Sequence, residues 1–238
     1  MACCRDPKAR RAGYATAAAV VIATGLGLLA SAVTASALTE MRAEQAWLQR
    51  DQDQRRLDSA QAAALETLML QAGEGRLLWR ETIDGAEVET LAEPEAAKLR
   101  ASTAKAGGAP LSDLGVTDAE ALIRAIRAVP ARAGLFGLAD AAPAEGWRRC
   151  GLSFISPYGL AQIAPSLAAP AEPAVSAHNP RAGQVWRIRA RLPDGQTEDR
   201  VVRFTGRPET PVLTLERRRQ GRQPPGDPCA AVTEGTNP

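Results

Sequence analysis

The chain opens with a long apolar segment that runs into a helical pattern without a break. No charged residue occurs from Ala12 to Thr39, and no proline occurs from Lys8 to Glu93. The segment 14–38 exceeds the roughly 20 residues that a helix needs to cross a bilayer core. Beyond it, apolar residues recur near helical spacing from Leu57 to Ala72. We therefore predict one helix that crosses a membrane, continues past it, and ends near Gly73.

Short elements are predicted after this helix. Two runs with strand character, Leu77–Ile83 and Ala86–Leu91, flank the pair Asp84-Gly85. Such a pair between two short runs is typical of a tight hairpin turn. The residues Thr117–Glu120 form a capping box, which predicts the start of a helix there. A second short helix is predicted around Leu135–Arg149.

The C-terminal part predicts three strands. Apolar residues alternate with the arginines Arg187, Arg189 and Arg191, which indicates a half-buried strand with its arginines on the solvent face. Further strands are predicted over Glu198–Thr205 and Thr210–Arg217. The fold class expected from these patterns is α+β.

The same patterns divide the chain. Ala101–Pro110 has the composition of a linker, and Pro157–Pro180 is rich in proline and without regular pattern. The expected segments are a basic leader (1–13), a transmembrane half of the helix (14–38), its periplasmic half (39–76), the first strands of a head (77–100), a helical insertion with loops (101–183), C-terminal antiparallel strands (184–218) and a disordered tail (219–238).

Charge and motif content argue against an enzyme or a nucleic-acid-binding protein. The formal net charge is +2, which is close to balanced, and His178 is the single histidine. The sequence has no phosphate-binding glycine loop, no dinucleotide fingerprint and no HExxH motif. No cysteine and histidine spacing fits zinc. Glu93 and Glu95 offer oxygen ligands suited to calcium, but two acids on a loop are a weak pattern.

The basic residues before the apolar segment predict orientation. Arg5, Lys8, Arg10 and Arg11 favour a cytoplasmic N-terminus. Cys150 and Cys229 would then face an oxidising compartment, where a disulfide persists. Two readings stay open for this pair, a Cys150–Cys229 bridge or two unpaired thiols.

Several segments, in order, resemble one family. The chain resembles the type IV pilin superfamily and, within it, the K-type minor pseudopilins of type II secretion systems (general secretion pathway protein K). The junction Arg10–Ala15 is similar to that family's leader junction. The other similar segments are Glu95–Leu99, Leu114–Thr117, Leu135–Leu138, Ile155–Gly159, Val185–Leu192, Val201–Gly206 and Pro211–Leu213.

The resemblance implies a function and a set of partners. It implies cleavage by a prepilin peptidase between Gly13 and Tyr14, and a pilin-like antiparallel sheet with a reduced helical insertion. Ala18 would replace the glutamate that most pilins carry at the fifth mature position. A subunit at a filament tip has no neighbour to supply the cation that such a carboxylate needs. The implied partners are the I- and J-type minor pseudopilins and the major pseudopilin, at the inner membrane.

One departure from the family concerns calcium. Arg100, Ala101 and Ser102 stand where the family has asparagines after its Lys-Leu pair. A calcium site is therefore not carried over from the resemblance, and no cofactor is expected.

Three alternatives compete with this interpretation. A minor pilin of a type IV pilus would share the architecture. A secreted or periplasmic binding domain is the second, because Ala35-Ser36-Ala37 forms a signal-peptidase site before Leu38. An envelope hydrolase is the third, and it would have to use His178.

Overall fold

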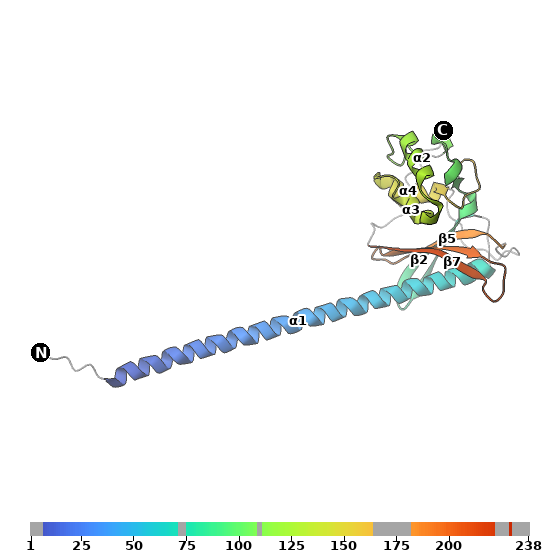
Figure 1. Ribbon diagram of the computed structural model, residues 1–238. Helices are drawn as coiled ribbons and strands as arrows, with labels where there is room; N and C mark the ends of the chain where they lie inside the picture. Colours follow the sequence, from blue (N-terminus) through green and yellow to red (C-terminus); the bar gives the residue numbers. More distant parts are fainter. Residues whose placement is uncertain (1–6, 71–74, 109–110, 164–181, 222–228, 230–238) are drawn as a thin grey trace. The chain divides into compact units, whose positions relative to one another are not determined.

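A computed structural model of the chain describes residues 7–70, 75–108, 111–163, 182–221 and 229 (Figure 1). The chain divides into two units, Met1–Gln52 and Asp53–Pro238, and we call the second unit the head. The predicted leader falls partly on residues 1–6, and His178 falls on 164–181, so both lie outside the described residues.

One helix, α1 (Pro7–Leu70), makes up the described part of the first unit and continues into the head. Its first residue is Pro7, which suits a helix start because proline has no N–H to leave unpaired there. The predicted long apolar helix is therefore confirmed, with a start in the basic leader. Its C-terminal boundary was predicted beyond the last described helical residue, Leu70.

The head contains a five-stranded antiparallel sheet in the order β1-β2-β5-β6-β7. Its members are β1 (Leu77–Ile83), β2 (Ala86–Pro94), β5 (Val185–Arg191), β6 (Thr197–Phe204) and β7 (Val212–Gln220). The expected α+β class and the three C-terminal strands are confirmed. The hairpin between β1 and β2 is confirmed too, since Asp84 and Gly85 both adopt positive φ angles, 48° and 76°, as a type I′ turn requires.

The C-terminal part of α1 covers one face of this sheet. Leu57, Ala60, Ala64 and Leu68 are buried. They pack on apolar side chains of the strands, which include Leu77, Val88, Ala92, Trp186, Ile188, Ala190, Val202 and Phe204. The apolar spacing at the C-terminal end of α1 therefore forms one side of the core between this helix and the sheet.

A helical insertion covers the opposite face (Figure 1). It contains α2 (Ala119–Ala128), α3 (Gly134–Ala139), α4 (Glu145–Phe154) and a small parallel pair, β3 (Leu99–Arg100) and β4 (Ile155–Ser156). Short 3₁₀ turns lie at Glu95–Ala97 (η1), Ala101–Thr103 (η2), Ala106–Gly108 (η3) and Ala131–Ala133 (η4). Trp147, Leu135 and Ile126 belong to its core, together with Val185 and Val201 from the sheet. The sheet therefore has a buried layer on both faces.

The helices of the insertion differ in detail from the prediction. The N-cap of α2 is Asp118, whose side chain accepts a hydrogen bond from the Ala121 N–H at 2.8 Å, so the cap lies one residue later than expected. The single helix predicted over Leu135–Arg149 is two helices, α3 and α4. Trp147 of α4 donates its indole N–H to the Leu138 carbonyl at 3.1 Å, which fixes the corner between them.

Two predicted loose segments are packed instead. In the expected linker 101–110, Ala101 and Ala104 are buried in the core of the insertion. The expected disordered tail from residue 219 is wrong at two described points, because β7 runs to Gln220 and Cys229 is buried. Small side chains make a segment resemble a linker, yet they also allow close packing.

Candidate functional site

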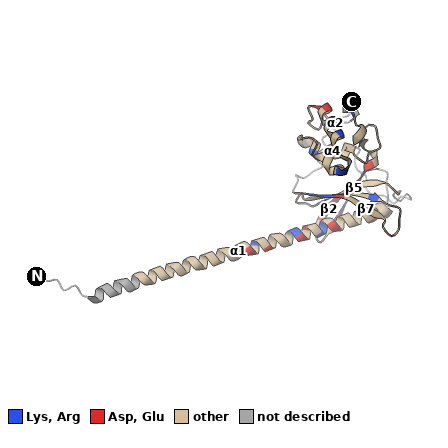
Figure 2. Cartoon of the chain, viewed as in Figure 1, with Lys and Arg blue, Asp and Glu red and all other residues tan. Residues whose placement is uncertain are grey.

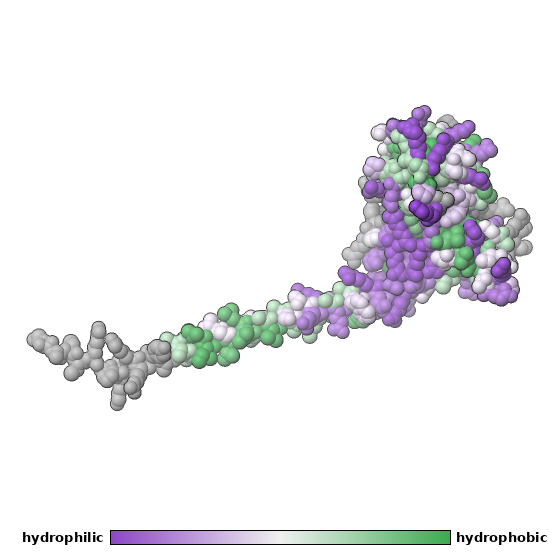
Figure 3. All heavy atoms as spheres, viewed as in Figure 1, coloured by the Kyte–Doolittle hydropathy of each residue, from purple (hydrophilic) through white to green (hydrophobic). Residues whose placement is uncertain are grey.

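The apolar segment of α1 is the first candidate site. Within the described residues, α1 is the one helix long and apolar enough to span a membrane. Figure 2 shows no charged residues over this part of α1, and Figure 3 shows it as hydrophobic surface. Its large side chains are exposed, among them Val20, Val21, Ile22, Leu26, Leu28, Leu29 and Val33. An exposed apolar helix of this length needs lipid or another helix around it.

Three hydroxyl side chains of this segment donate hydrogen bonds to the helix's own backbone. Thr24 donates to the Val20 carbonyl, Ser31 to the Gly27 carbonyl and Thr34 to the Ala30 carbonyl, each four residues back. Such bonds remove the need for water, so the segment suits a hydrocarbon environment despite its hydroxyls.

The predicted processing residues lie in this same helix. Gly13 and Tyr14 fall inside α1, where the structure describes only the course of the helix. Ala18 is exposed on the helix surface. The three positions lie close together in the sequence, near the start of α1.

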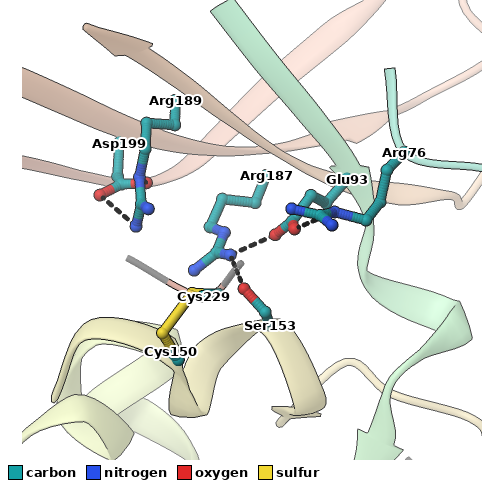
Figure 4. The surroundings of a disulfide bond; sticks show 8 residues. All are labelled: Arg76, Glu93, Cys150, Ser153, Arg187, Arg189, Asp199 and Cys229. Carbon is teal, nitrogen blue, oxygen red and sulfur yellow. Dashed lines mark hydrogen bonds and ion pairs between the residues drawn. A yellow bond between two sulfur atoms is a disulfide. The ribbon is translucent and has the colours of Figure 1, made fainter. Parts of the chain in front are cut away.

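The second candidate site is a cluster of buried charges between the sheet and the insertion (Figure 4). Glu93 is the last but one residue of β2 and Glu95 is the first residue of η1, and both are buried. Lys98 donates to Glu95 Oε1 at 2.5 Å and to Glu93 Oε2 at 3.2 Å. Arg76 donates to Glu93 Oε1 at 2.9 Å, and Arg187 also donates to Glu93.

This cluster corrects the prediction for the β5 arginines. Arg187 was expected on a solvent face, but it is 1% exposed and lies under the insertion. Arg189 is partly buried and donates to Asp199 at 3.0 Å and 3.3 Å. The alternation of side chains was predicted correctly. What the period of two does not reveal is whether a polar face meets water or a second layer.

The same contacts bear on calcium. The Glu93 oxygens and Glu95 Oε1 accept hydrogen bonds from Lys98, Arg76 and Arg187, which are cations that a metal ion would have to displace. Among the described residues, no group of three or more His, Cys, Asp and Glu side chains is arranged to hold a metal. Glu93 and Glu95 therefore do not fit a calcium site in this arrangement.

A disulfide lies next to this cluster. Cys150 of α4 is joined to Cys229, with their Cα atoms 5.4 Å apart and a sequence separation of 79 residues. This is the bridged alternative of the two readings for the pair. Ser153 is three residues after Cys150 in α4, and its hydroxyl accepts a hydrogen bond from Arg187 at 3.2 Å. Helix α4 thus carries both one end of the disulfide and a hydrogen-bond partner of Arg187 (Figure 4).

A second charge cluster lies on the face that α1 covers. Glu198 of β6 is buried and accepts hydrogen bonds from Arg219 Nε at 2.6 Å and from Arg217 Nη2 at 3.0 Å. Asp58 of α1 lies 3.5 Å from Arg200 and 3.7 Å from Arg219. These pairs attach the helix to β6 and β7. Glu198 and Asp199 therefore serve opposite faces of the strand, as their adjacency predicts.

The pKa values of two buried carboxyls follow from these contacts. Burial alone would raise the pKa of Glu93, but the charges of Arg187, Lys98 and Arg76 outweigh it, and the pKa lies well below its ordinary value. Burial likewise opposes the shift at Glu198, whose pKa is lowered by hydrogen bonds from Arg217 and Arg219. Both groups are ionised in the head at neutral pH.

Acid is therefore expected to destabilise the head. A carboxyl whose pKa is depressed on folding contributes stability above its unfolded pKa, and this contribution is lost as the pH falls through the folded pKa. We expect denaturant midpoints to be steady from about pH 7 to 5 and to fall below about pH 4.5. In the Glu93→Gln, Glu198→Gln double variant, the midpoint should be lower at pH 7 and should change less on acidification. An equally steep decline in that variant would contradict this assignment.

Several residues of these sites escaped the sequence analysis. Gln61 is fully buried and donates to the Ile188 and Glu198 carbonyls. Glu216 accepts from the Leu135 and Phe136 N–H groups and from the Tyr158 hydroxyl. The one signal available for Gln61 is its place in the apolar stripe of α1. For Glu216 there is none, because its partners depend on the fold of the insertion.

Comparisons with known proteins identify no relative. No known protein family, no curated protein and no solved structure matches this chain.

Proposed function

We propose that this chain is a minor pseudopilin of a type II secretion system, a structural subunit without enzymatic activity. One observation carries the proposal: a single helix, α1, combines an exposed apolar segment with an amphipathic end that forms part of the core of an antiparallel-sheet head. A helix of this kind places a folded head on a membrane and leaves the apolar segment available to other helices.

The proposed location is the inner membrane, crossed once. The N-terminus would lie in the cytoplasm, as the basic residues before the span favour, and the head in the periplasm. The Cys150–Cys229 disulfide supports this orientation, because such bonds persist in oxidising compartments. The segment 17–39 would pack against helices of the I- and J-type minor pseudopilins and the major pseudopilin. Together they would form or cap a filament that supports protein export.

The mature N-terminus tests this proposal. We would purify the protein from the native envelope and determine its first residue by mass spectrometry. A chain that begins at Tyr14, with an N-methyl group, would support processing by a prepilin peptidase after Gly13. A chain that begins at Leu38 would overturn the proposal in favour of a secreted or periplasmic domain. An intact N-terminus would also overturn it, because the subunit would not have been processed as a pseudopilin.

The phenotype of a gene deletion separates this proposal from the most similar alternative. A minor pilin of a type IV pilus would also begin at Tyr14. Deletion of the gene should abolish export of proteins through the outer membrane if the chain is a pseudopilin. Loss of pili or twitching motility with normal export would instead assign it to a pilus.

A charge at Ala18 is expected to block assembly. An Ala18→Glu variant places a carboxylate in the apolar segment, which is unfavourable unless a cation pairs with it; the cost reaches roughly 2.5–3.5 kcal/mol for a charge at the centre of a membrane helix. We expect at least a tenfold loss of co-purification with the other pseudopilins, while the thermal unfolding of the head stays unchanged. Ala18→Ser is the matched control, since a hydroxyl can bond back to its own helix. Undiminished co-purification of the Ala18→Glu variant would count against the assembly role.

A further inference from the structure

The guanidinium of Arg187 has one buried edge that its ion pairs do not use. Its Nη2 donates to the Ser153 hydroxyl at 3.2 Å and to Glu93. Its Nη1 is buried and has no hydrogen-bond acceptor within the described part of the chain. Arg187 as a whole is 1% exposed. A buried charged N–H without an acceptor lowers the stability of the folded state, and a negative charge formed beside it would offset that cost.

The disulfide lies on the side of this unused edge. Ser153 and Cys150 are three residues apart in α4, which places them on the same face of the helix. Figure 4 shows the second terminal nitrogen of Arg187 directed toward the Cys150–Cys229 bond, away from Glu93. Both cysteines are buried, at 1% and 2% exposure. The cation and the two sulfur atoms therefore share one enclosed environment.

Reduction of the bond would change the charge in this environment. A thiolate is stabilised next to a cation and is disfavoured by apolar burial. The other charged groups on this side are held in pairs: Arg189 with Asp199, and Lys98 and Arg76 with the two glutamates. The charged groups around the bond are Arg76, Glu93, Glu95, Lys98, Arg187, Arg189 and Asp199. Of the lysine and arginine nitrogens in this set, Arg187 Nη1 is the buried one left without an acceptor among the described residues.

We propose that Arg187 sets the redox equilibrium of the Cys150–Cys229 disulfide in the folded head. The charge of Arg187 would stabilise the reduced pair by holding one of its sulfurs as a thiolate. This inference does not depend on membrane orientation or on a role in a filament.

The exchange uses two thiols of the reductant. One reductant thiolate attacks a sulfur of the bond and forms a mixed disulfide, and the other cysteine leaves as a thiolate. The second reductant thiolate then displaces the remaining cysteine and forms the reductant's own disulfide. Two electrons pass from the reductant to Cys150 and Cys229, and protons exchange with water. A disulfide oxidant of the same class drives the reverse reaction.

The test is a redox equilibrium on the full chain in detergent, with Cys3→Ser and Cys4→Ser in all samples. The chain is equilibrated in mixtures of reduced and oxidised glutathione, and alkylation followed by mass spectrometry counts the reduced fraction. With Arg187→Gln we expect the equilibrium to shift at least tenfold toward the disulfide, which is about 30 mV. Arg189→Gln, which removes a like charge from the same strand face, should shift it less than threefold. An unchanged equilibrium in Arg187→Gln, or equal shifts in both variants, would overturn the proposal.

A second measurement does not rely on folding of the Arg187 variant. The reduced chain with Arg187 in place is alkylated with iodoacetamide over a range of pH, with circular dichroism used to check that the head stays folded. If Arg187 acts as proposed, one thiol titrates clearly below the ordinary cysteine value of about 8.5. Titration of both thiols at or above that value would reject the proposal. An Arg187→Lys variant, which keeps the charge, should retain the low value.

Discussion

Replacing Glu93 with alanine is expected to lower the free energy of unfolding of the head by about 3–5 kcal/mol, the range for breaking a buried ion pair. Glu93 is 2% exposed and accepts hydrogen bonds from Arg76, Lys98 and Arg187. Without it, Lys98 and Arg187 remain buried with Glu95 as the nearest carboxylate. The uncompensated positive charge then disfavours the folded head.

The measurement is denaturant unfolding of the full chain in detergent, followed by the fluorescence of the head's tryptophans. Glu89→Ala is the matched control on the same strand, because Glu89 pairs with Arg80 at an exposed position. An exposed pair of this kind contributes about 0–1 kcal/mol. If Glu93→Ala lowered the free energy of unfolding no more than Glu89→Ala does, the buried cluster would not stabilise the head.

Removal of the disulfide is expected to have an effect of similar size. The bond closes a loop with a sequence separation of 79 residues. In the chain-entropy model, a loop of that length stabilises the folded state by about 4–5 kcal/mol, because the unfolded chain is restricted. The Cys150→Ser, Cys229→Ser double variant should therefore unfold at a much lower denaturant concentration than the oxidised parent. Cys3→Ser with Cys4→Ser is the control, and it should leave the midpoint unchanged.

Thiol counting gives an independent check on the bond. The full sequence has 4 cysteines, and in the bridged chain only Cys3 and Cys4 are free to react in denatured, unreduced protein. If the leader is removed after Gly13, the mature chain has no reactive thiol before reduction. Two reactive thiols from Cys150 and Cys229 in native material would refute the bond.

Much of the fold could be predicted from local sequence. The hairpin is encoded by Asp84-Gly85, since few other residue pairs accept two positive φ angles. The strands β5 and β6 are encoded by alternation, and the packing face of α1 by the spacing of Leu57, Ala64 and Leu68. Each of these depends on residues that are near one another in the chain, which is why a single sequence reveals them.

The candidate site depended on long-range contacts, and there the prediction was incomplete. Arg187 looked like a surface residue because its alternation is the same whether water or a helix covers it. Glu93 and Glu95 were weighed as calcium ligands because Arg187, nearly a hundred positions later, could not be placed beside them. The glycine and proline residues around Cys229 predict a disordered tail, and nothing in the local sequence shows that Cys229 itself is buried.

The hydrogen bonds of Gln61 determine how a pulling force on α1 would reach the sheet. Its amide donates to the carbonyls of Ile188 and Glu198, at 3.2 Å and 2.9 Å. Those carbonyls belong to β5 and β6, which lie inside the sheet rather than at its edge. Tension applied along the helix would therefore reach the sheet by two routes: through the chain into the edge strand β1, and through the Gln61 amide into the interior strands β5 and β6. The second route would share the load with strands that are hydrogen-bonded on both sides.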